Sequence, residues 1–444
     1  GNKVFDSIIN YHNEYKDYIL NGGDVLETSK LPSSTKVSID NYNKIKNNKK
    51  KKKKKSSRHY SKRDIVTQDI QFIGKSEELV IEKKHRNLSF YFQIPTKIKL
   101  QVKDFSINYK VESDLSDPSS LPTGGFSCIV SYRPTNKKNS LGIAMKCIDM
   151  TSLIKYKNST IEKILREIDI LREIREFSNK EKVQTLVHFI GNKKDFITRD
   201  NGDKHEICYI FMEKMDNDLS HFLRLEQSKL SEMLTLSNFR MIAKQIYNGL
   251  AALHRNNLVH NDMKPGNVLY SYKKNEVTIR LTDFNGSFHI KPVDNFKESK
   301  TTGTLGYNSP EKTYDYKNVT EKTDVWTTAL ILYQLVNCYK TETRPSKIAN
   351  EIKLKGSSPV LVICRRYKKK FSHIDDKISC KKEQVKYLLS RDLQKLIEHL
   401  QSNTGFLTSE KDINSYQLIL QNSLCKDIHE RWSANKVLDQ ELFN

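Results

Sequence analysis

The sequence predicts an α+β protein of two lobes, a small β-rich lobe followed by a larger helical lobe. Segments rich in β-branched and aromatic residues recur between residue 78 and Met212. One long run with helical apolar spacing, Ile161–Phe177, interrupts them, and beyond Met212 most segments have helical spacing. The length of 444 residues suits two or three cooperating units.

The composition is that of a folded chain with solvated parts. Hydrophobic residues make up 37% of the chain and charged residues 29%, which allows a core and leaves room for tails or loops. The formal net charge of +23 favours anionic partners, among them nucleic acid, acidic protein, phosphorylated groups and anionic membrane. Charge alone does not choose among these classes.

Cysteine usage and apolar runs indicate the compartment. Seven cysteines occur with no CxxC pair and no histidine at metal-ligand spacing, which disfavours a zinc site or a disulfide framework. The sequence contains no run of about 18 apolar residues, so it predicts no transmembrane helix. The first residues, from Gly1 on, lack the apolar centre of a signal peptide. We therefore expect an intracellular protein, cytoplasmic or nuclear.

The first 63 residues divide into two segments of different composition. Residues 1–43 predict a helical extension, because Val4–Leu20 has helix-like apolar spacing. Residues 44–63 hold twelve Lys and Arg and no acid, including seven consecutive lysines at Lys49–Lys55, so we expect this segment to be disordered. It is either a solvated insert or a site for nuclear import or for anchoring to nucleic acid, acidic protein or anionic lipid.

The order of the remaining segments follows the predicted lobes. Residues 64–110 predict a strand-rich extension, with strands around Glu78–Glu82 and at Leu88–Ile94 and Ile98–Val102. The small lobe is assigned to residues 111–215 and the helical lobe to residues 216–444. Within the helical lobe, residues 341–422 resemble an insertion, which carries the basic run Cys364–Lys370. That run is either a solvated face or a docking site for an acidic substrate or partner.

The stretch Leu258–Leu269, LVHNDMKPGNVL, carries the strongest chemical signal. It places Asp262, Lys264 and Asn267 in a loop that follows the amphipathic segment Phe239–His254 and precedes a short strand. Such a loop can hold a carboxylate near a substrate hydroxyl, a cation near a transferring phosphoryl group and an amide oxygen on a metal ion. These are the groups that phosphoryl transfer requires.

This loop resembles the catalytic loop HRDxKxxN of eukaryotic-type protein kinases, here HNDMKPGN. Further along, LTDFNG at 281–286 resembles the metal-binding DFG element, with Asp283 as the implied Mg²⁺ ligand. GTLGYNSPE at 303–311 is similar to the end of an activation segment. The resemblance places Thr304 where it would bond Asp262 and Lys264.

Two further motifs of the family concern support of the loop. TDVW at 323–326 resembles the start of a buried helix whose acid, Asp324, holds the backbone of the catalytic loop. Arg431 matches an arginine that, in the family, forms a salt bridge with the Glu of the APE motif, here Glu311. Such a buried pair stabilises the fold only while both partners are present.

Upstream, IAMK at 143–146 resembles the family's VAIK strand, which implies that Lys146 holds the α- and β-phosphates of ATP. Its implied partner is a Glu on the following helix. Glu167 fits the sequence context best, and Glu162 and Glu173 on the same helical run remain alternatives. A surface helix so rich in Arg and Glu also forms simple i,i+4 pairs.

The remaining nucleotide contacts are implied by a weaker match. LPTGGFSCIV at 121–130 is similar to the glycine loop GxGxxGxV, although Pro122 and Ser127 stand at two of the glycine positions. CYIFMEKM at 208–215 resembles the strand that leads to the hinge. Together with the VAIK-like strand, these segments imply nucleotide contacts from Gly124, Gly125, Phe126, Ser127, Ile129, Ala144, Met212, Glu213 and Met215.

The chain departs from the family pattern at two chemically important positions. Asn261 replaces the Arg of HRD, so a pocket that captures a phosphate on the activation segment is missing. We therefore expect phosphorylation of the segment to be a weaker candidate for the switch, with Ser299, Thr301 and Thr302 as its possible sites. Asn285 replaces the Gly of DFG, and Asn is the residue other than Gly that best tolerates φ > 0.

The resemblance, over about Val111 to Phe443, implies a two-lobed protein kinase that transfers the γ-phosphoryl group of ATP to Ser or Thr hydroxyls of proteins. The preference for Ser and Thr rests on Lys264, which tyrosine-directed members usually lack. The implied cofactors are ATP and Mg²⁺, with Mn²⁺ as the alternative metal. The competing hypothesis is a pseudokinase scaffold, in which the altered glycine loop and Asn285 mark lost turnover. An anionic partner for Lys49–Lys55 is compatible with either hypothesis.

Overall fold

A computed structural model gives the structure of the protein. It describes residues 67–73, 79–85, 88–102, 105–115, 121, 127–135, 142–156, 158–199, 201–290, 303–314, 319–338 and 358–443. The side chains of 67–69, 79, 83–85, 88, 102, 105, 155, 156 and 158–160 are outside this description. All described residues belong to one compact unit, which begins at Lys62. The expectations for the helix Val4–Leu20 and for the lysine run lie outside the described residues.

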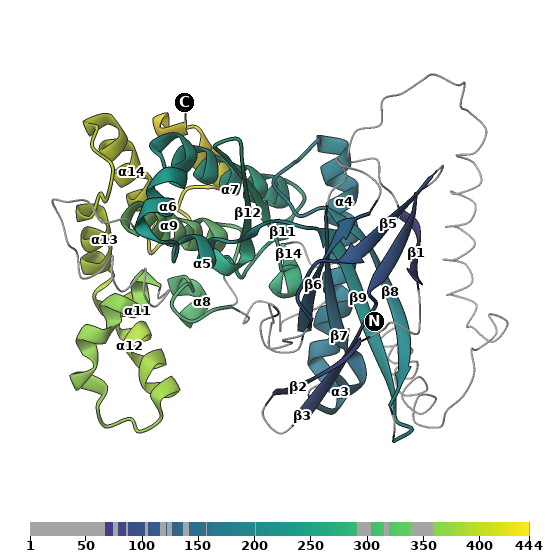
Figure 1. Ribbon diagram of the computed structural model, residues 1–444. Coiled ribbons are helices and arrows are strands. Elements are labelled where there is room, and N and C mark those ends of the chain that lie inside the picture. Colours follow the sequence, from purple (N-terminus) through teal and green to yellow (C-terminus); the bar gives the residue numbers. More distant parts are fainter. Residues whose placement is uncertain are drawn as a thin grey trace, which may run out of the picture. The chain divides into compact units, whose positions relative to one another are not determined.

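The small lobe is built on one antiparallel sheet of seven strands (Figure 1). Its central strands β6 and β7 present alternate residues to opposite faces, as the two-residue period of a strand requires. Cys128, Val130 and Tyr132 of β6 face the lobe's core, whereas Ile129 is only partly buried. In spatial order the strands are β1 (Thr67–Ile73), β4 (Lys97–Val102), β5 (Phe105–Val111), β6 (Ser127–Pro134), β7 (Ile143–Asp149), β9 (Lys204–Glu213) and β8 (Phe189–Thr198).

The predicted extension forms part of this lobe. Its expected strands are confirmed as the hairpin β2 (Leu79–His85) and β3 (Leu88–Ile94) and as β4, and β1 pairs with β4 at the sheet edge. The Phe72 ring of β1 lies edge-on to the Tyr209 ring of β9, with 4.9 Å between centroids. The sheet is therefore curled, so that its β1 edge comes back over β9.

Buried hydrogen bonds fasten the hairpin to the sheet. The Tyr132 hydroxyl donates to the Pro95 carbonyl (2.7 Å), and the Tyr91 amide donates to the buried Asp149 carboxylate (3.0 Å). His205 of β9 contacts the same carboxylate at 3.0 Å through Nδ1. Since a buried carboxylate without partners would be costly, these contacts stabilise the extension in one position.

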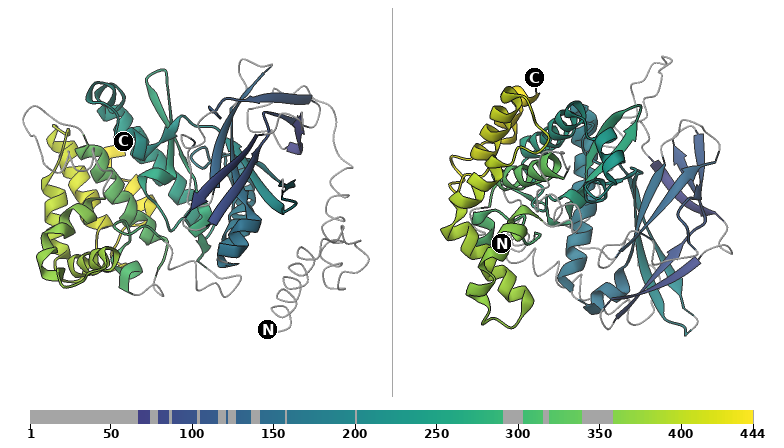
Figure 2. Two further views of the ribbon diagram at one scale, coloured as in Figure 1. Left: turned by 60° about the horizontal axis from the view of Figure 1, so that its bottom comes forward. Right: turned by 60° about the vertical axis from the view of Figure 1, so that its left-hand side comes forward.

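The helical lobe gathers most of the described helices, and the three views agree that it lies beside the sheet lobe (Figures 1 and 2). The predicted segment Phe239–His254 is confirmed within α7, whose first turn is capped by the Thr235 hydroxyl accepting from the Asn238 amide (3.1 Å). The lobe's helices are α5 (Leu219–Phe222), α6 (Gln227–Met233), α7 (Leu236–Arg255), α8 (Pro310–Tyr314), α9 (Lys322–Asn337), α11 (Pro359–Cys364), α12 (Lys377–Arg391), α13 (Leu393–Ser402), α14 (Glu410–Ser423) and α15 (Ala434–Leu438).

Two helices belong to the small lobe, α3 (Met150–Tyr156) and α4 (Asn158–Glu181), and the predicted run Ile161–Phe177 is confirmed as the centre of α4. Apart from the seven-stranded sheet and the β2–β3 hairpin, the described strands form one three-stranded sheet and the pair β11 (Leu258–Val259) with β14 (Phe288–His289). β12 (Val268–Lys273) pairs with β13 (Glu276–Leu281), and β10 (Asn217–Asp218) adds to β12. In the part of the chain that is described, no helix is long and apolar enough to span a membrane.

Gly405 is required where the chain passes the end of α9. Its φ is +53°, and a Cβ there would lie 1.8 Å from the Val336 carbonyl oxygen. We expect Gly405→Ala to destabilise the fold by about 3 kcal/mol, since the clash adds to the strain of positive φ. Urea unfolding measures this loss. Gly202→Ala is the control, because Gly202 also has positive φ (+87°) but no atom within 4 Å. Equal losses of stability in both variants would mean that the strain of positive φ, and not the clash with Val336, causes the effect.

Candidate active site

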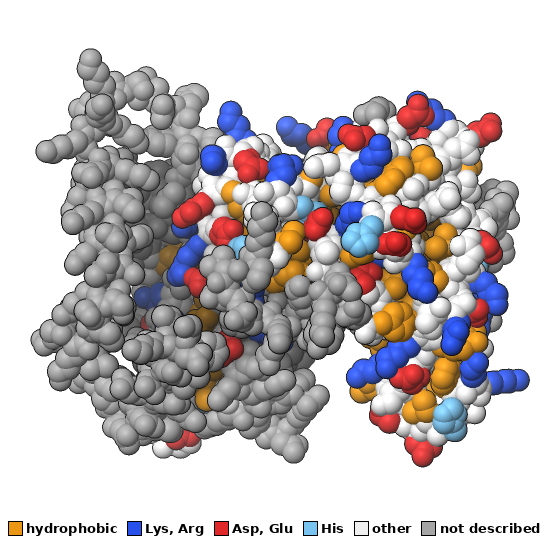
Figure 3. All heavy atoms as spheres, turned by 180° about the vertical axis from the view of Figure 1, so that it is seen from behind, with side chains coloured by type: hydrophobic (Ala, Val, Ile, Leu, Met, Phe, Trp, Pro, Cys, Tyr) orange, Lys and Arg blue, Asp and Glu red, His pale blue; other side chains and the backbone are white. Residues whose placement is uncertain are grey.

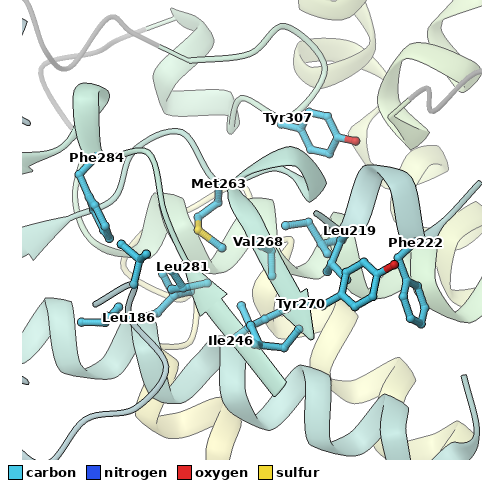
Figure 4. Packing of buried hydrophobic residues seen from close by; sticks show 14 of the residues in the cluster. Leu186, Leu219, Phe222, Ile246, Met263, Val268, Tyr270, Leu281, Phe284 and Tyr307 are labelled. Atoms are coloured by element: carbon cyan, nitrogen blue, oxygen red, sulfur yellow. The ribbon is translucent and has the colours of Figure 1, made fainter. Parts of the chain in front are cut away.

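The segment that follows α7 forms a loop held between short strands. β11 (Leu258–Val259) pairs with β14 (Phe288–His289), and the 3₁₀ turn Pro265–Asn267 leads into β12. The side chain of Met263 inserts into the apolar core below the loop, near Val268 and Phe284 (Figure 4). The apolar residue within HNDMKPGN thus fixes the loop, and the polar residues on either side of it are left for chemistry.

Asp324 holds the backbone of this loop from the first turn of α9. Its carboxylate accepts from the amides of His260 (2.9 Å) and Asn261 (2.8 Å) and contacts His254 Nε2 at 3.0 Å. Burial alone would raise the pKa of Asp324, but the contacts with His254, His260 and Asn261 outweigh burial and lower it. The expected support of the loop by Asp324 is confirmed.

Asp262, Lys264 and Thr304 form one hydrogen-bonded cluster. Lys264 Nζ lies 2.7 Å from Asp262 Oδ2 and donates to Thr304 Oγ1 at 3.1 Å. The Thr304 hydroxyl donates to Asp262 Oδ1 at 2.8 Å. Residues 42 positions apart in the sequence are therefore brought together as the resemblance implied, and the Asp262 carboxylate is fixed at both oxygens.

Asn267 and Asp283 present oxygen atoms beside this cluster. The Asn267 amide nitrogen donates to the Asp262 carbonyl at 2.7 Å, which turns its side-chain oxygen to the opposite side. Oδ1 of Asp283 is buried and has no hydrogen-bond partner among the described residues. Carboxylate and amide oxygens are ligand types that suit a hard divalent cation such as Mg²⁺.

Lys146 faces the same carboxylate from the small lobe. Its Nζ lies 2.9 Å from both carboxylate oxygens of Glu167 on α4 and 3.8 Å from Asp283 Oδ1. Burial acts to lower the pKa of Lys146, but attraction to the two carboxylates outweighs it and raises the pKa. Of the three candidate acids the structure pairs Glu167 with the lysine, whereas Glu173 contacts His289 at 3.0 Å.

The strand that leads to the second lobe ends at Glu213. Met212 is buried on β9, and the Glu213 amide donates to the His188 carbonyl at 3.0 Å. The Glu213 carboxylate accepts from Arg280 Nε at 2.7 Å, which ties β9 to β13. The Glu213 side chain and amide thus serve the protein itself. Of the contacts predicted at Glu213 and Met215, the Glu213 carbonyl and the Met215 main chain remain candidates for binding adenine.

The predicted glycine-loop residues are only partly described. Gly124, Gly125 and Phe126 lie outside the described residues. Ser127 is buried at the start of β6, whereas Ile129 of β6 and Ala144 and Lys146 of β7 are partly buried. Ile129 and Lys146 are direct partners across the two strands. The side chains predicted to meet the nucleotide from this sheet therefore share its less buried face.

The two departures from the family pattern are accommodated differently. Asn261 has φ +67°, which Asn tolerates better than other residues with a Cβ, and its side-chain amide donates to the Gly286 carbonyl at 2.9 Å. At the second position, Asn285 does not have positive φ, so its tolerance of that conformation is not used. Asp283 takes the left-handed conformation (φ +64°), and Asn285 lies in a 3₁₀ turn, Phe284–Gly286.

Glu311 and Arg431 form the expected buried pair. The Arg431 guanidinium donates to both Glu311 oxygens, at 2.7 and 2.9 Å, and its side chain is fully buried. Burial alone would raise the pKa of Glu311, but the bonds from Arg431 lower it below its ordinary range. The pair joins α8 to the segment before α15 and takes no part in the cluster around Asp262.

Lys312, which follows the SPE motif on α8, is not marked by any pattern in the sequence. Its side chain is 8% exposed, and its Nζ donates to the main-chain carbonyl of Asn261 in the catalytic-like loop. A single lysine beside a motif has no periodicity or spacing that would mark it. Only the packing of α8 under the loop identifies it.

The basic run at 364–370 lies between α11 and α12. Its lysines and arginines are exposed, and Lys370 Nζ lies 3.9 Å from the centre of the Tyr387 ring. On the face of the molecule shown in Figure 3, Lys and Arg side chains of the described residues lie among acidic side chains. A docking role for this run therefore stays a prediction.

Comparison with known proteins adds independent information. A family profile described as protein kinase domain matches residues 116–443. Mitogen-activated protein kinase MPS1 of Pyricularia oryzae is 26% identical over 241 residues, which are 53% of this chain and 51% of that protein. Calcium-dependent protein kinase 5 of Plasmodium berghei is 27% identical over 286 residues, 64% of this chain and 44% of that protein.

A third relative, serine/threonine-protein kinase atg1 of Dictyostelium discoideum, is 28% identical over 207 residues. The matched residues are 46% of this chain and 28% of that protein. The chain thus spans about half or less of the length of these three relatives.

Proposed function

The chain belongs to the family of protein kinase domains, and from this premise we propose that it is a serine/threonine kinase that transfers the γ-phosphoryl group of ATP to protein hydroxyls. The cluster of Asp262, Lys264 and Thr304 is the observation that carries this proposal. It combines the Asp262 carboxylate, which is held at both oxygens, with the Lys264 ammonium group at a hydrogen-bonding distance of 2.7 Å. In phosphoryl transfer, positioning and electrostatic stabilisation account for most of the catalysis.

Each residue of the cluster has a distinct role in this proposal. Asp262 orients the substrate hydroxyl and accepts its proton. Lys264 stabilises the negative charge on the transferring group, and its contact with Thr304 keeps it beside Asp262. Lys146, held by Glu167, binds the α- and β-phosphates. Because Lys146 keeps its charge through burial by pairing with acids, it stays available as a cation at neutral pH.

The cofactors in this proposal are ATP and Mg²⁺, with Mn²⁺ as an alternative metal. Asn267 and Asp283 would hold the metal. The buried Oδ1 of Asp283, which accepts no hydrogen bond from the described residues and lies 3.8 Å from Lys146 Nζ, supports this assignment. The metal, when bound, neutralises charge on the β- and γ-phosphates. Adenine would meet the Glu213 carbonyl and the Met215 main chain, and the face of the sheet with Ile129 and Ala144 would cover it.

The choice of Ser and Thr as acceptors rests on Lys264 and is supported by one relative whose name gives that specificity. Protein substrates follow from the family, whereas the identity of any substrate does not. An anionic partner for Lys49–Lys55 remains a separate hypothesis, which the proposed reaction neither requires nor excludes.

Transfer of labelled phosphate from ATP to a generic basic protein and a generic acidic protein tests the proposal. We expect label on Ser or Thr of at least one of them with Mg²⁺ or Mn²⁺ present. The label should disappear when EDTA removes the metal, because Asp283 and Asn267 then have no cation to place on the phosphates. Label on Tyr alone would contradict the acceptor assignment. No metal-dependent transfer to either protein or to the chain itself would favour the scaffold hypothesis.

A further inference from the structure

Lys312 is an unusual residue because a lysine is rarely buried unless its charge is paired. Its Nζ reaches the main-chain carbonyl of Asn261, the residue that precedes Asp262. Asn261 stands where the family has an Arg, so the loop itself carries no cation at that position. The cation nearest to the Asn261 carbonyl comes instead from α8.

The space around Lys312 is shaped for its side chain. A Cβ at Gly303, where φ is +149°, would lie 2.6 Å from Lys312 Nζ and 2.8 Å from Lys312 Cε. The residue after Gly303 is Thr304, whose hydroxyl donates to Asp262. Lys312 therefore lies against two segments next to the Asp262 carboxylate. One is Asn261, which precedes Asp262, and the other is Gly303, which precedes Thr304.

The charges that face Lys312 come from three elements. Asp262 and Lys264 lie on the catalytic-like loop, Asp324 on α9, and Glu311 precedes Lys312 on α8. Asp324 is also in contact with His254 of α7, and Glu311 is neutralised by Arg431. Attraction to the three acids stabilises the charged lysine, while burial and Lys264 oppose it.

We propose that Lys312 is a positioning residue for phosphoryl transfer, which holds the Asn261 carbonyl and so keeps the Asp262 carboxylate in its productive position. This inference rests on the proposed function. In this proposal the side chain of Lys312 links α8 to the loop. The link therefore requires no phosphate on the activation segment.

The loss of the Lys312 proton at high pH gives this role a pH dependence that can be measured. Burial lowers the pKa of Lys312 to about 8, so its charge is lost as pH rises through that value. In the unfolded chain the lysine keeps its proton up to about 10.5. Between these values the unfolded chain binds more protons, and stability attributable to Lys312 rises with pH. A fall in activity above pH 8 would therefore not be caused by unfolding through this residue.

The test compares Lys312→Met, Lys312→Arg and the control Lys322→Met between pH 6.5 and 9.5. Lys322 also donates to a main-chain carbonyl, that of His429 at 2.8 Å, and His429 is not part of the loop. We expect Lys312→Met to lower kcat at least tenfold at pH 7, with KM for ATP within twofold of the original. Lys312→Arg should restore most of kcat and abolish the decline above pH 8, because Arg stays charged.

Several results would overturn the inference. These are an unchanged kcat in Lys312→Met, an equal loss in Lys322→Met, or a decline above pH 8 that persists in Lys312→Arg. If the original chain transfers no phosphate, the proposed function fails and hydrogen exchange tests the positioning claim by itself. The amides of Asn261 and Asp262 should then exchange at least tenfold faster in Lys312→Met than in Lys322→Met. Equal exchange would refute the claim.

Discussion

Asp262→Asn is expected to lower kcat for phosphoryl transfer by about 10²–10⁴, the usual contribution of a positioned acid or base. The amide cannot accept a proton from the substrate hydroxyl. Its oxygen can still accept from Lys264, and its nitrogen can donate to Thr304, so the loop should keep its shape. KM for ATP should change little, because the proposed contacts with the phosphates and the metal come from Lys146 and Asp283, which the substitution leaves in place.

Steady-state kinetics together with binding of a fluorescent ATP analogue measure these two effects separately. The control is Asp195→Asn, in which a partly exposed aspartate of β8, whose carboxylate accepts from the Phe196 amide at 2.9 Å, loses its charge. It should have the original kcat. A variant at Asp262 that transfers phosphate at a tenth or more of the original rate would contradict the role of base.

Arg431→Met is expected to destabilise the fold by about 3–5 kcal/mol, because it leaves the buried Glu311 carboxylate without its partner. The same guanidinium also donates to the Cys425 carbonyl (2.9 Å) and the Lys322 carbonyl (3.2 Å). Both acceptors would lose a bond in a region closed to water. Urea unfolding at pH 7 measures the change in free energy.

The double variant Glu311→Gln with Arg431→Met should lose less stability than Arg431→Met alone, since no charge is left buried. The acid dependence gives a second check. The pKa of Glu311 is lowered in the folded protein, so the stability it contributes is complete above its ordinary value of 4.5. That contribution is lost as pH falls through the folded value, and the double variant should lack it. A double variant less stable than the single would contradict the account.

Much of the site could be predicted because the motifs HNDMKPGN and LTDFNG carry chemistry at fixed spacing. The partner of Lys146 was harder to predict. Glu162, Glu167 and Glu173 occupy one helix, and which of them faces the lysine depends on the rotation of α4 against the sheet. That rotation is set by packing between elements, which a sequence pattern does not contain.

The other features that the sequence did not predict also depend on how distant parts of the chain pack together. The strands of the extension were predicted from their composition, but their membership in the sheet of β6 and β7 depends on long-range pairing. The left-handed residue in LTDFNG is Asp283, although the substitution of Gly by Asn drew attention to Asn285. Lys312 was missed because burial of a charged side chain is visible only once α8 and the loop lie together.

The curled sheet of the small lobe also has a consequence for solubility. An open sheet that began at β6 would present unpaired amides and carbonyls along its outer strand, which other chains can extend by pairing. Here β5 and β4 continue the sheet, and β1 lies beyond them, where the Phe72 ring packs over β9. The family profile begins at residue 116, after these strands. In a fragment that begins at this boundary, β6 would be an exposed edge strand with unpaired amides and carbonyls, and we expect such a fragment to aggregate. In the full chain, the extension covers this edge and so reduces aggregation.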